Sequence, residues 1–223
     1  SAVRDLSTTG SFTHTINTNS GDLNLLAGRN LTVSTGSDSN LNASGRINLQ
    51  GSNITSTGNS LSVRGNSGVN VVASNGNIQV QRPVGVAFVS VSGPVAINAT
   101  GGSTSLSTGG TLQLSGATSV TVNATNNTVL VGSNALIDGP NSRLTAGQDL
   151  TLSTANLAQG AVGPVLLQAG RDVLLPAVPG NNYNGQVGSL NVSAGRDVVG
   201  SGPFTLDLRT TTGDLTMSAA RNV

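Results

Sequence analysis

One short motif recurs along this chain and constrains its fold more than any other feature. It reads QAGRDVLL at 168–175, SAGRDVVG at 193–200 and TAGQDLTL at 145–152. LAGRNLTV at 26–33 is another copy, ASGRINLQ at 43–50 a looser one, and SAARNV at 218–223 a shorter one. In the last four copies, the small residue before Arg or Gln recurs after 23, 25 and 25 residues. A fixed period of this length indicates stacked repeats.

Apolar and polar residues alternate on both sides of the motif. GDLNLLAGRN at 21–30, GSLNVSAGRD at 188–197 and GDLTMSAARN at 213–222 align without a gap. Alternation with a period of two predicts short strands with one buried face. We expect the glycine between them to take a positive φ angle where the chain bends. The residues expected at these repeated turns are Gly28, Arg29, Gly45, Arg46, Gly147, Gly170, Arg171, Asp172, Gly195, Arg196, Asp197 and Arg221.

Composition limits the kind of core that the chain can build. Aromatic residues make up 2% and charged residues 9%, against about a quarter charged in typical domains. The basic residues are all Arg and the acidic ones all Asp, so Lys and Glu, both good helix formers, are missing. A narrow column of stacked Val, Leu, Ile and Ala suits this composition better than a large compact core. Each large aliphatic side chain contributes about 1.5–3 kcal/mol on burial.

The spacing of the apolar residues predicts an all-β fold, a right-handed parallel β-helix. Strands of about five residues, three per circuit of roughly 17–25 residues, leave no room for crossover helices, so parallel pairing has to arise between successive coils. Coils spaced by about 4.8 Å stack into an elongated rod, and the chain length predicts roughly ten of them. Asn, Ser and Thr at the corners can hydrogen-bond along the axis.

The whole chain, 1–223, reads as a single β-helix segment, a piece of a longer repeat protein. Loop insertions are expected near 155–164 and near 177–188, the second of which contains Tyr183, the only tyrosine. No apolar run approaches the ~20 residues of a membrane span, and cysteine is absent, which excludes disulfides. A net charge of +1 argues against nucleic acid and against an anionic membrane as the main partner.

The AGRD-type turns carry a family resemblance. AGRDV at 169–173 and 194–198, AGRNL at 27–31, and the preceding GDLNL and GSLNV are similar to the short repeats of filamentous-haemagglutinin-like exoproteins. These are adhesins and contact-dependent inhibition filaments of Gram-negative bacteria, exported by two-partner secretion. The family's Asn-Pro-Asn motif is missing, which points to an internal repeat segment. The resemblance implies cell adhesion, virulence, and location outside the cell or on its surface. It offers no functional residue to carry over.

Candidate sites are few. His14 is the only histidine, in a Ser/Thr-rich stretch, and we interpret it as an exposed strand residue. A nucleophilic Ser would need a base such as His or Lys beside it, and no calcium or phosphate-loop motif occurs, so no catalytic, metal or cofactor site is predicted. Phe88 is expected inside the fold. Tyr183 is the candidate contact residue, because loops carry function more often than scaffolds. The Arg–Asp pairs at 171/172 and 196/197 are interpreted as exposed corner salt links.

The sequence therefore predicts a non-enzymatic shaft segment of a secreted or surface-displayed bacterial filament. Its expected partners are an outer-membrane two-partner transporter during export and, through the parent protein, a receptor or glycan on a host or neighbouring cell. Exposed strand edges would permit end-to-end self-association.

Two other functions stay open. A β-helix enzyme acting on polysaccharides needs two carboxylates that converge in one groove. A surface-binding solenoid, such as an ice-binding protein, needs a flat face of regularly spaced Thr, and no such period is visible in the sequence.

Overall fold

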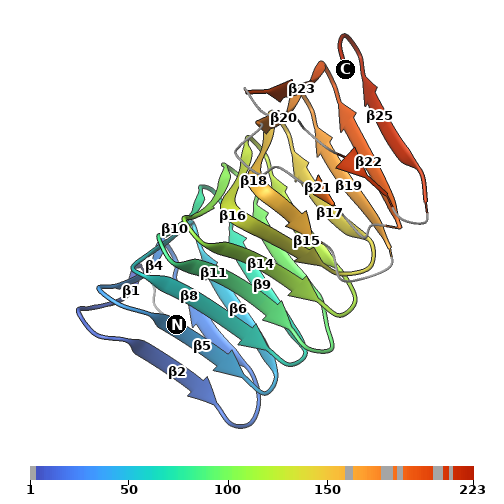
Figure 1. Cartoon of the computed structure of the whole chain (residues 1–223). Helices are drawn as coiled ribbons and strands as arrows, with labels where there is room; N and C mark the ends of the chain where they lie inside the picture. The colour runs from blue at the N-terminus through green and yellow to red at the C-terminus, as the bar shows by residue number, and fades with distance from the viewer. Residues whose placement is uncertain (1–3, 159–162, 177–182, 185–187, 203–207, 211–212) are drawn as a thin grey trace.

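The chain winds into a parallel β-solenoid whose turns stack along one axis (Figure 1), as seen in a computed structural model. The structure describes residues 4–158, 163–176, 183–184, 188–202, 208–210 and 213–223. The turns as far as β18 (Leu150–Ala158) place strands on three faces, and the described strands pair in parallel with their equivalents in neighbouring turns. The last two described turns contribute strands only to the first and third of these faces. The predicted all-β class, parallel pairing and rod shape are confirmed, and no helix occurs in the described residues.

Face 1 begins each turn. Its strands are β1 (Leu6–Gly10), β4 (Asn30–Thr35), β7 (Asn53–Thr57), β10 (Ile78–Arg82), β13 (Thr104–Thr108), the first part of β16 (Thr128–Asp138), the first part of β18 (Leu150–Ala158), β20 (Asp172–Pro176) and β23 (Asp197–Ser201).

Face 2 follows. Its strands are β2 (His14–Thr18), β5 (Ser39–Ala43), β8 (Ser60–Gly65), β11 (Gly85–Ser90), β14 (Thr111–Gly116) and the second parts of β16 and β18. In β16 the corner between faces 1 and 2 disappears, because one strand of 11 residues pairs with both β13 and β14.

Face 3 closes each turn. Its strands are β3 (Leu23–Leu26), β6 (Arg46–Gly51), β9 (Gly68–Ala73), β12 (Val95–Ala99), β15 (Val120–Ala124), β17 (Ser142–Ala146), β19 (Pro164–Ala169), β22 (Ser189–Ala194) and β25 (Leu215–Ala219). A further pair, β21 (Tyr183–Asn184) with β24 (Leu208–Arg209), forms a separate two-stranded sheet.

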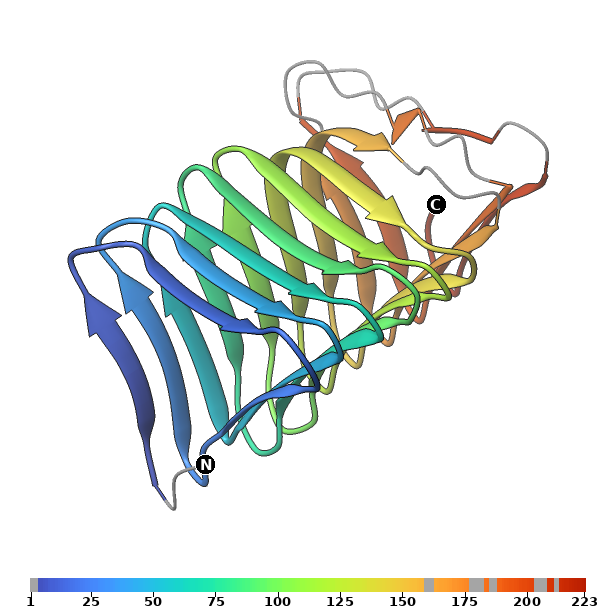
Figure 2. The same ribbon diagram turned by 90° about the horizontal axis from the view of Figure 1, so that it is seen from below.

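Two details of the predicted geometry need correction. The 9-stranded sheet of face 3 takes one strand from each turn, so the described chain makes fewer than the ten coils expected. Register partners lie 22 residues apart at the closest, as for Thr121 and Arg143, and 26 at the farthest, as for Ile78 and Thr104. The short end of the expected range, 17 residues, does not occur in these pairs, because the chain runs along all sides of the column before it returns to the same position (Figure 2).

The strand β18 continues through Ala158, where an insertion near 155–164 was expected to begin. The rest of that range is described only from residue 163 onward. Of the second expected insertion, near 177–188, only residues 183–184 and 188 are described, and 183–184 form β21.

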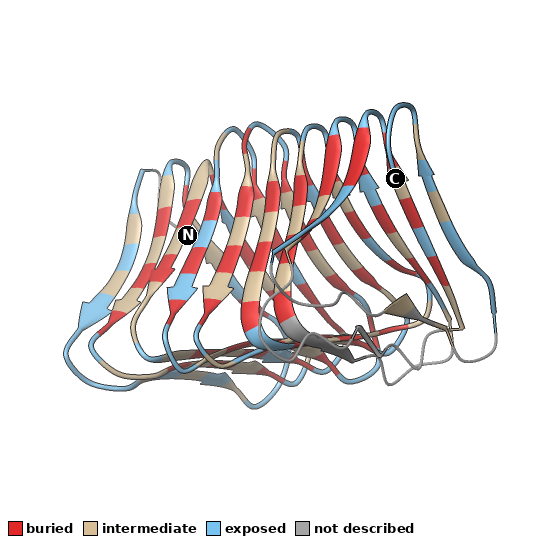
Figure 3. Ribbon diagram, turned by 45° about the horizontal axis from the view of Figure 1, so that its top comes forward, coloured by how far each residue is buried: buried red, intermediate tan, exposed pale blue. Residues whose placement is uncertain are grey.

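The core is a column of aliphatic side chains along the axis. Buried and half-buried positions alternate along the strands, as in β5, and the buried ones line up from turn to turn (Figure 3). Where face 3 reaches its last corner the ladder consists of small residues, with Gly51 between Ala27 and Ala73. The alanines Ala27, Ala73, Ala99, Ala124, Ala146, Ala169 and Ala194 are all buried. Small side chains fit there because two walls of the column converge.

Candidate functional site

The corner between faces 3 and 1 carries a ladder of polar side chains that runs through the described turns. The residues of this corner ladder are Asp5, Asn30, Asn53, Asn77, Ser103, Asn127, Asp149, Asp172, Asp197 and Asn222. Most side-chain oxygens accept the backbone N–H of the next rung. Asn77 N, for example, donates to Asn53 Oδ1 at 3.0 Å, and Ser103 N to Asn77 Oδ1 at 2.8 Å. The ladder thereby satisfies corner N–H groups that would otherwise lack acceptors.

Arginines cross-link the rungs wherever the ladder residue is an aspartate. Arg29 Nε donates to Asp5 Oδ1 at 3.0 Å, and three further pairs repeat the contact with Nε–Oδ1 distances of 2.7–2.9 Å: Arg171 with Asp149, Arg196 with Asp172, and Arg221 with Asp197. In each pair the Nη2 group bonds the second carboxylate oxygen, giving the two-pronged geometry that arginine favours.

The salt links predicted within one turn are present but are not the tightest contacts, and their aspartates are buried rather than exposed. Arg196 Nε lies 3.4 Å from Asp197 Oδ2. Arg171 Nε lies 3.8 Å from Asp172 of its own turn, whereas its tight partner is Asp149 of the turn before. A planar guanidinium reaches along the axis to the neighbouring rung more easily than back onto the adjacent residue. The stacking of Arg171, Arg196 and Arg221 on successive rungs is confirmed by the backbone bonds that join them.

These contacts shift the pKa values of three of the aspartates and of the four arginines. The hydrogen bond from Arg29 is the main cause that lowers the pKa of Asp5 to about 2. The hydrogen bond from Arg221 likewise lowers the pKa of Asp197 to about 2, and Arg171 lowers the pKa of Asp149. The pKa values of the four arginines are raised by the same bonds. The pairs of Asp5 with Arg29, Asp149 with Arg171 and Asp197 with Arg221 are therefore ionised at neutral pH.

The repeat glycines owe their place to close approach rather than to a positive φ angle, which corrects the expectation from the sequence. A Cβ added at Gly170 would lie 2.1 Å from the carbonyl oxygen of Gly147, and one at Gly195 would lie 2.0 Å from that of Gly170. Positive φ angles among the described glycines occur at Gly21, Gly58 and Gly202 instead. Successive turns thus stack backbone on backbone at this corner.

Gly45 and Arg46 lie at a different corner from the other repeat residues. They join β5 to β6, between faces 2 and 3, so the looser copy of the motif is out of register with the AGRD turns. The Arg46 backbone N–H donates to Asp22 Oδ1 at 2.7 Å, but its guanidinium makes no ion pair with the described residues. The true equivalent of Gly28 one turn later is Ser52, because Ala27 and Gly51 occupy the same ladder position.

Arg82 is a feature that the sequence reasoning missed. It ends β10, points into the solenoid and is completely buried. Its Nη1 donates to the Ser60 carbonyl at 3.0 Å, and its Nη2 donates to Ser56 Oγ at 2.6 Å and to the Val33 carbonyl at 3.1 Å. The hydroxyls of Thr35 and Ser39 accept at 3.3 and 3.1 Å. One side chain therefore joins three successive turns. Among the described residues, Nε has no partner.

Burial of this charge has an electrostatic cost. Desolvation lowers the pKa of Arg82 to about 10, and the charge of Asp38 acts in the opposite direction. Asp38 is linked indirectly, since its carboxylate accepts the Ser60 hydroxyl at 2.7 Å. Gly58, with φ of 137°, leaves the space that the guanidinium fills, because a Cβ there would lie 2.3 Å from Nη1. The signal in the sequence that could have identified Arg82 is its place at an inward position at the end of an alternating strand.

Three residues singled out in the sequence have different outcomes. Phe88 is 1% exposed and pairs in register with Val63 and Leu114, so its predicted place in the core is confirmed. His14 is half-buried rather than exposed, and it shares the inward face of β2 with Ile16. Tyr183 belongs to β21; its side chain lies outside the described part of the structure, so its role as a contact residue stays a prediction.

The structure aligns hydroxyls that show no obvious period in the sequence. On the outer side of face 1, Ser7 pairs with Thr32 and Thr32 with Thr55. Gln79 and, two turns later, Val129 interrupt this row. A parallel row brings Ser34 Oγ within 2.7 Å of Thr57 Oγ1, so these hydroxyls bond each other. The face therefore lacks the long unbroken Thr array that an ice-binding surface needs.

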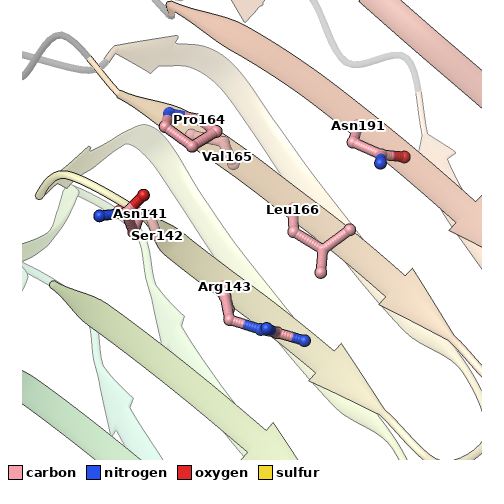
Figure 4. Close-up of a pocket in the computed structure, with 7 residues that line it drawn as sticks. All are labelled: Asn141, Ser142, Arg143, Pro164, Val165, Leu166 and Asn191. Atoms are coloured by element: carbon pink, nitrogen blue, oxygen red, sulfur yellow. The ribbon is translucent and has the colours of Figure 1, made fainter.

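Three shallow grooves open on the outer surface. One, of about 220 Å³, has a mostly apolar surface (Figure 4). Its lining residues are Asn141, Ser142, Arg143, Pro164, Val165, Leu166 and Asn191. A second, of about 240 Å³, lies on face 3 beside Arg46 and Pro94. The third, of about 480 Å³, is polar and lies at the corner between faces 2 and 3. None of these three grooves is lined by a carboxylate among the described residues.

The chemistry available at the corners is the holding together of turns, through charge-assisted bonds, stacked amides and one buried guanidinium. In the described residues, no group of three metal-binding side chains comes together, and no helix long and apolar enough to cross a membrane is present. Comparison of the chain with family models, with curated proteins and with solved structures gives no match.

Proposed function

We propose that this chain is a shaft segment of a large secreted or surface-displayed bacterial adhesin or filament, which acts by holding other parts of the parent protein away from the cell. The observation that carries the proposal is the corner ladder. It links the described turns from Asp5 to Asn222. A solenoid cross-linked in this way transmits force along its axis.

The resemblance of the AGRD turns to filamentous-haemagglutinin-like repeats supports the same role. In such a protein an outer-membrane transporter of the two-partner type exports the chain, and the parent protein contacts a receptor or glycan on another cell. End-to-end contact between copies is a further property of this proposal, because parallel strand edges can pair with one another.

Removal of one complete turn tests the proposal. Ala99 and Ala124 occupy the same position in successive turns, so deletion of residues 100–124 joins equivalent points and keeps the register. In the producing bacterium, we expect this variant to remain exposed to external protease and to support attachment to target cells. The control deletion of residues 100–116 breaks the register and should abolish display.

Two results would contradict the shaft role. The first is a protein that external protease cannot reach in intact cells. The second is a specific catalytic activity that the in-register deletion removes. A polysaccharide-cleaving activity of the purified chain would favour the enzyme alternative, although none of the three grooves offers the paired carboxylates that such chemistry uses.

A further inference from the structure

The polar groove at the corner between faces 2 and 3, which we call the Arg64 groove, spans four turns. Its lining residues are Asn17, Thr18, Asn19, Asn42, Ala43, Ser44, Arg64, Asn66 and Val91. At about 4.8 Å per turn, a groove of this span runs roughly 14 Å along the axis. It is therefore an elongated site, with a shape that suits a chain-like ligand better than a compact one.

Register places the key side chains in one row. Asn17 pairs with Asn42, and Asn42 with Arg64, so all three project outward from the same position of face 2. Asn42 Nδ2 donates to Asn17 Oδ1 at 2.8 Å, which leaves the Asn42 oxygen and the Asn17 amino group for a ligand. The row thus offers an acceptor, a donor and a cation.

The Arg64 guanidinium is exposed and has no hydrogen-bond or ion-pair partner among the described residues. This distinguishes it from Arg29, Arg171, Arg196 and Arg221, whose charges are neutralised by ladder aspartates. Arg46 begins β6 two residues beyond the groove residue Ser44, and its guanidinium is also unpaired among the described residues. The nearby Asp22 carboxylate already accepts the Arg46 backbone N–H. The Asp22 carboxylate keeps its charge, but the two arginines outnumber it, so these groups together carry a net positive charge on a nearly neutral chain.

The walls of the groove are preformed. Ser44 N donates to the Thr18 carbonyl at 3.2 Å and Asn66 N to the Ala43 carbonyl at 3.1 Å, so the corner backbone is bonded from turn to turn. Ser92 N and Ser92 Oγ both donate to the Asn66 carbonyl. A site held in this way needs little ordering when a ligand binds, which favours affinity.

We propose that the Arg64 groove binds an acidic polysaccharide, in which a uronate carboxylate pairs with Arg64 and the sugar hydroxyls bond the flanking amides. Arginine matches a carboxylate through two parallel hydrogen bonds, and Asn side chains both donate to and accept from hydroxyl groups. This proposal rests on the proposed attachment function. It specifies the class of surface polymer that this segment contacts.

The test uses oligogalacturonate and its methyl ester, which keeps the hydroxyls and loses the charge. By titration calorimetry, we expect the acid to bind about tenfold more tightly than the ester, as for one charge-assisted contact. In Arg64→Gln, the tenfold preference for the acid over the ester should be lost. In Arg64→Lys, part of this preference should remain because the positive charge is kept. Arg143→Gln is the matched control, since Arg143 is likewise exposed and without a partner among the described residues, but beside a mainly apolar groove.

Equal binding of acid and ester, or an unchanged affinity in Arg64→Gln, would overturn the proposal. So would an equal loss in Arg64→Gln and Arg143→Gln, which would indicate only general attraction to positive charge. Thermal melting of each variant shows whether the fold is intact. If the groove fails this test while the in-register deletion is still displayed and adhesive, the shaft role stands without it.

Discussion

Single residues decide how closely two turns can approach. At Gly170 the missing side chain allows the backbone of one turn to lie against the carbonyl of the turn before. At Arg82 the opposite occurs, because one long side chain fills the interior over three turns and takes up hydroxyl and carbonyl acceptors. Both residues help to set the distance between neighbouring turns in the folded state. A substitution at either position therefore changes how the turns stack.

Gly170→Ala should destabilise the protein by about 1–3 kcal/mol, since the new methyl group would meet the Gly147 carbonyl at 2.1 Å and force the turns apart. Gly85→Ala is the matched control, because its nearest neighbour would be the Thr111 carbonyl at an ordinary 3.6 Å. Urea denaturation of both variants measures the difference. Equal stability of the two would refute the close-approach explanation.

A double-mutant cycle tests the space shared by Gly58 and Arg82. Gly58→Ala brings a methyl group within 2.3 Å of Arg82 Nη1 and also strains a positive φ angle. In an Arg82→Met background, the collision with the guanidinium disappears, while the backbone strain and the close contact with the Thr35 carbonyl at 2.5 Å remain. We therefore expect Gly58→Ala to cost less there, with a coupling free energy of about 0.5–3 kcal/mol from denaturation midpoints. Additive effects would show that the two side chains do not compete for space.

At the scale of the element, the corner ladder replaces sheet hydrogen bonds where the backbone turns. Its members differ in charge but share a side-chain oxygen at the start of face 1. The aspartate rungs add arginine cross-links, whereas the Asn and Ser rungs of the middle turns do without them. Every rung of the corner ladder thus has a side-chain oxygen acceptor, and only the aspartate rungs have an ion pair as well.

Asn77 is the rung at which acceptor and charge can be separated. Asn77→Ala removes the acceptor for Ser103 N and should cost about 1–2 kcal/mol, whereas Asn77→Asp keeps an oxygen in place and should cost less. Thermal unfolding followed by circular dichroism compares them. A larger loss for Asp than for Ala would mean that charge, rather than the acceptor, governs the middle rungs.

The aspartate rungs should make stability depend on acid pH. The pKa of Asp5 and that of Asp197 fall from 3.8 to about 2 on folding, and that of Asp149 is also lowered. A lowered folded pKa gives stability that is present above the unfolded value and lost as pH falls through the folded value. We therefore expect the melting temperature to drop between about pH 4 and pH 2. The double variant Asp149→Asn/Asp197→Asn should show a shallower drop; an unchanged slope would contradict this assignment.

At the scale of the whole molecule, stability comes from contacts between successive turns, as in other repeat proteins. In the described residues, the strand pairings of the three faces join each strand to its equivalent in the turn before or after it. A defect in one turn is therefore felt first by the two turns that flank it.

Phe88→Ala shows this locality. The side chain is fully buried between Val63 and Leu114, so its removal leaves a cavity. We expect the free energy of unfolding to fall by about 3–5 kcal/mol. Hydrogen exchange should rise most in β8, β11 and β14 and least in β22, on the distant end of the column. Uniform loss of protection along the rod would indicate that the solenoid unfolds as one cooperative unit.

The sequence by itself determined the strands, the parallel stacking and the aliphatic column, because period-2 alternation and the AGRD repeat are local patterns renewed every turn. It also located most of the corner residues, from Gly28 to Arg221. Only the tertiary structure decided which rungs pair most tightly, since Arg171 makes its two-pronged contact with Asp149, 22 residues away, and only a longer one with its neighbour Asp172. The buried Arg82, the out-of-register Gly45 and the Arg64 row likewise depend on how residues from different turns align, and that alignment is set by the varying lengths of the corners.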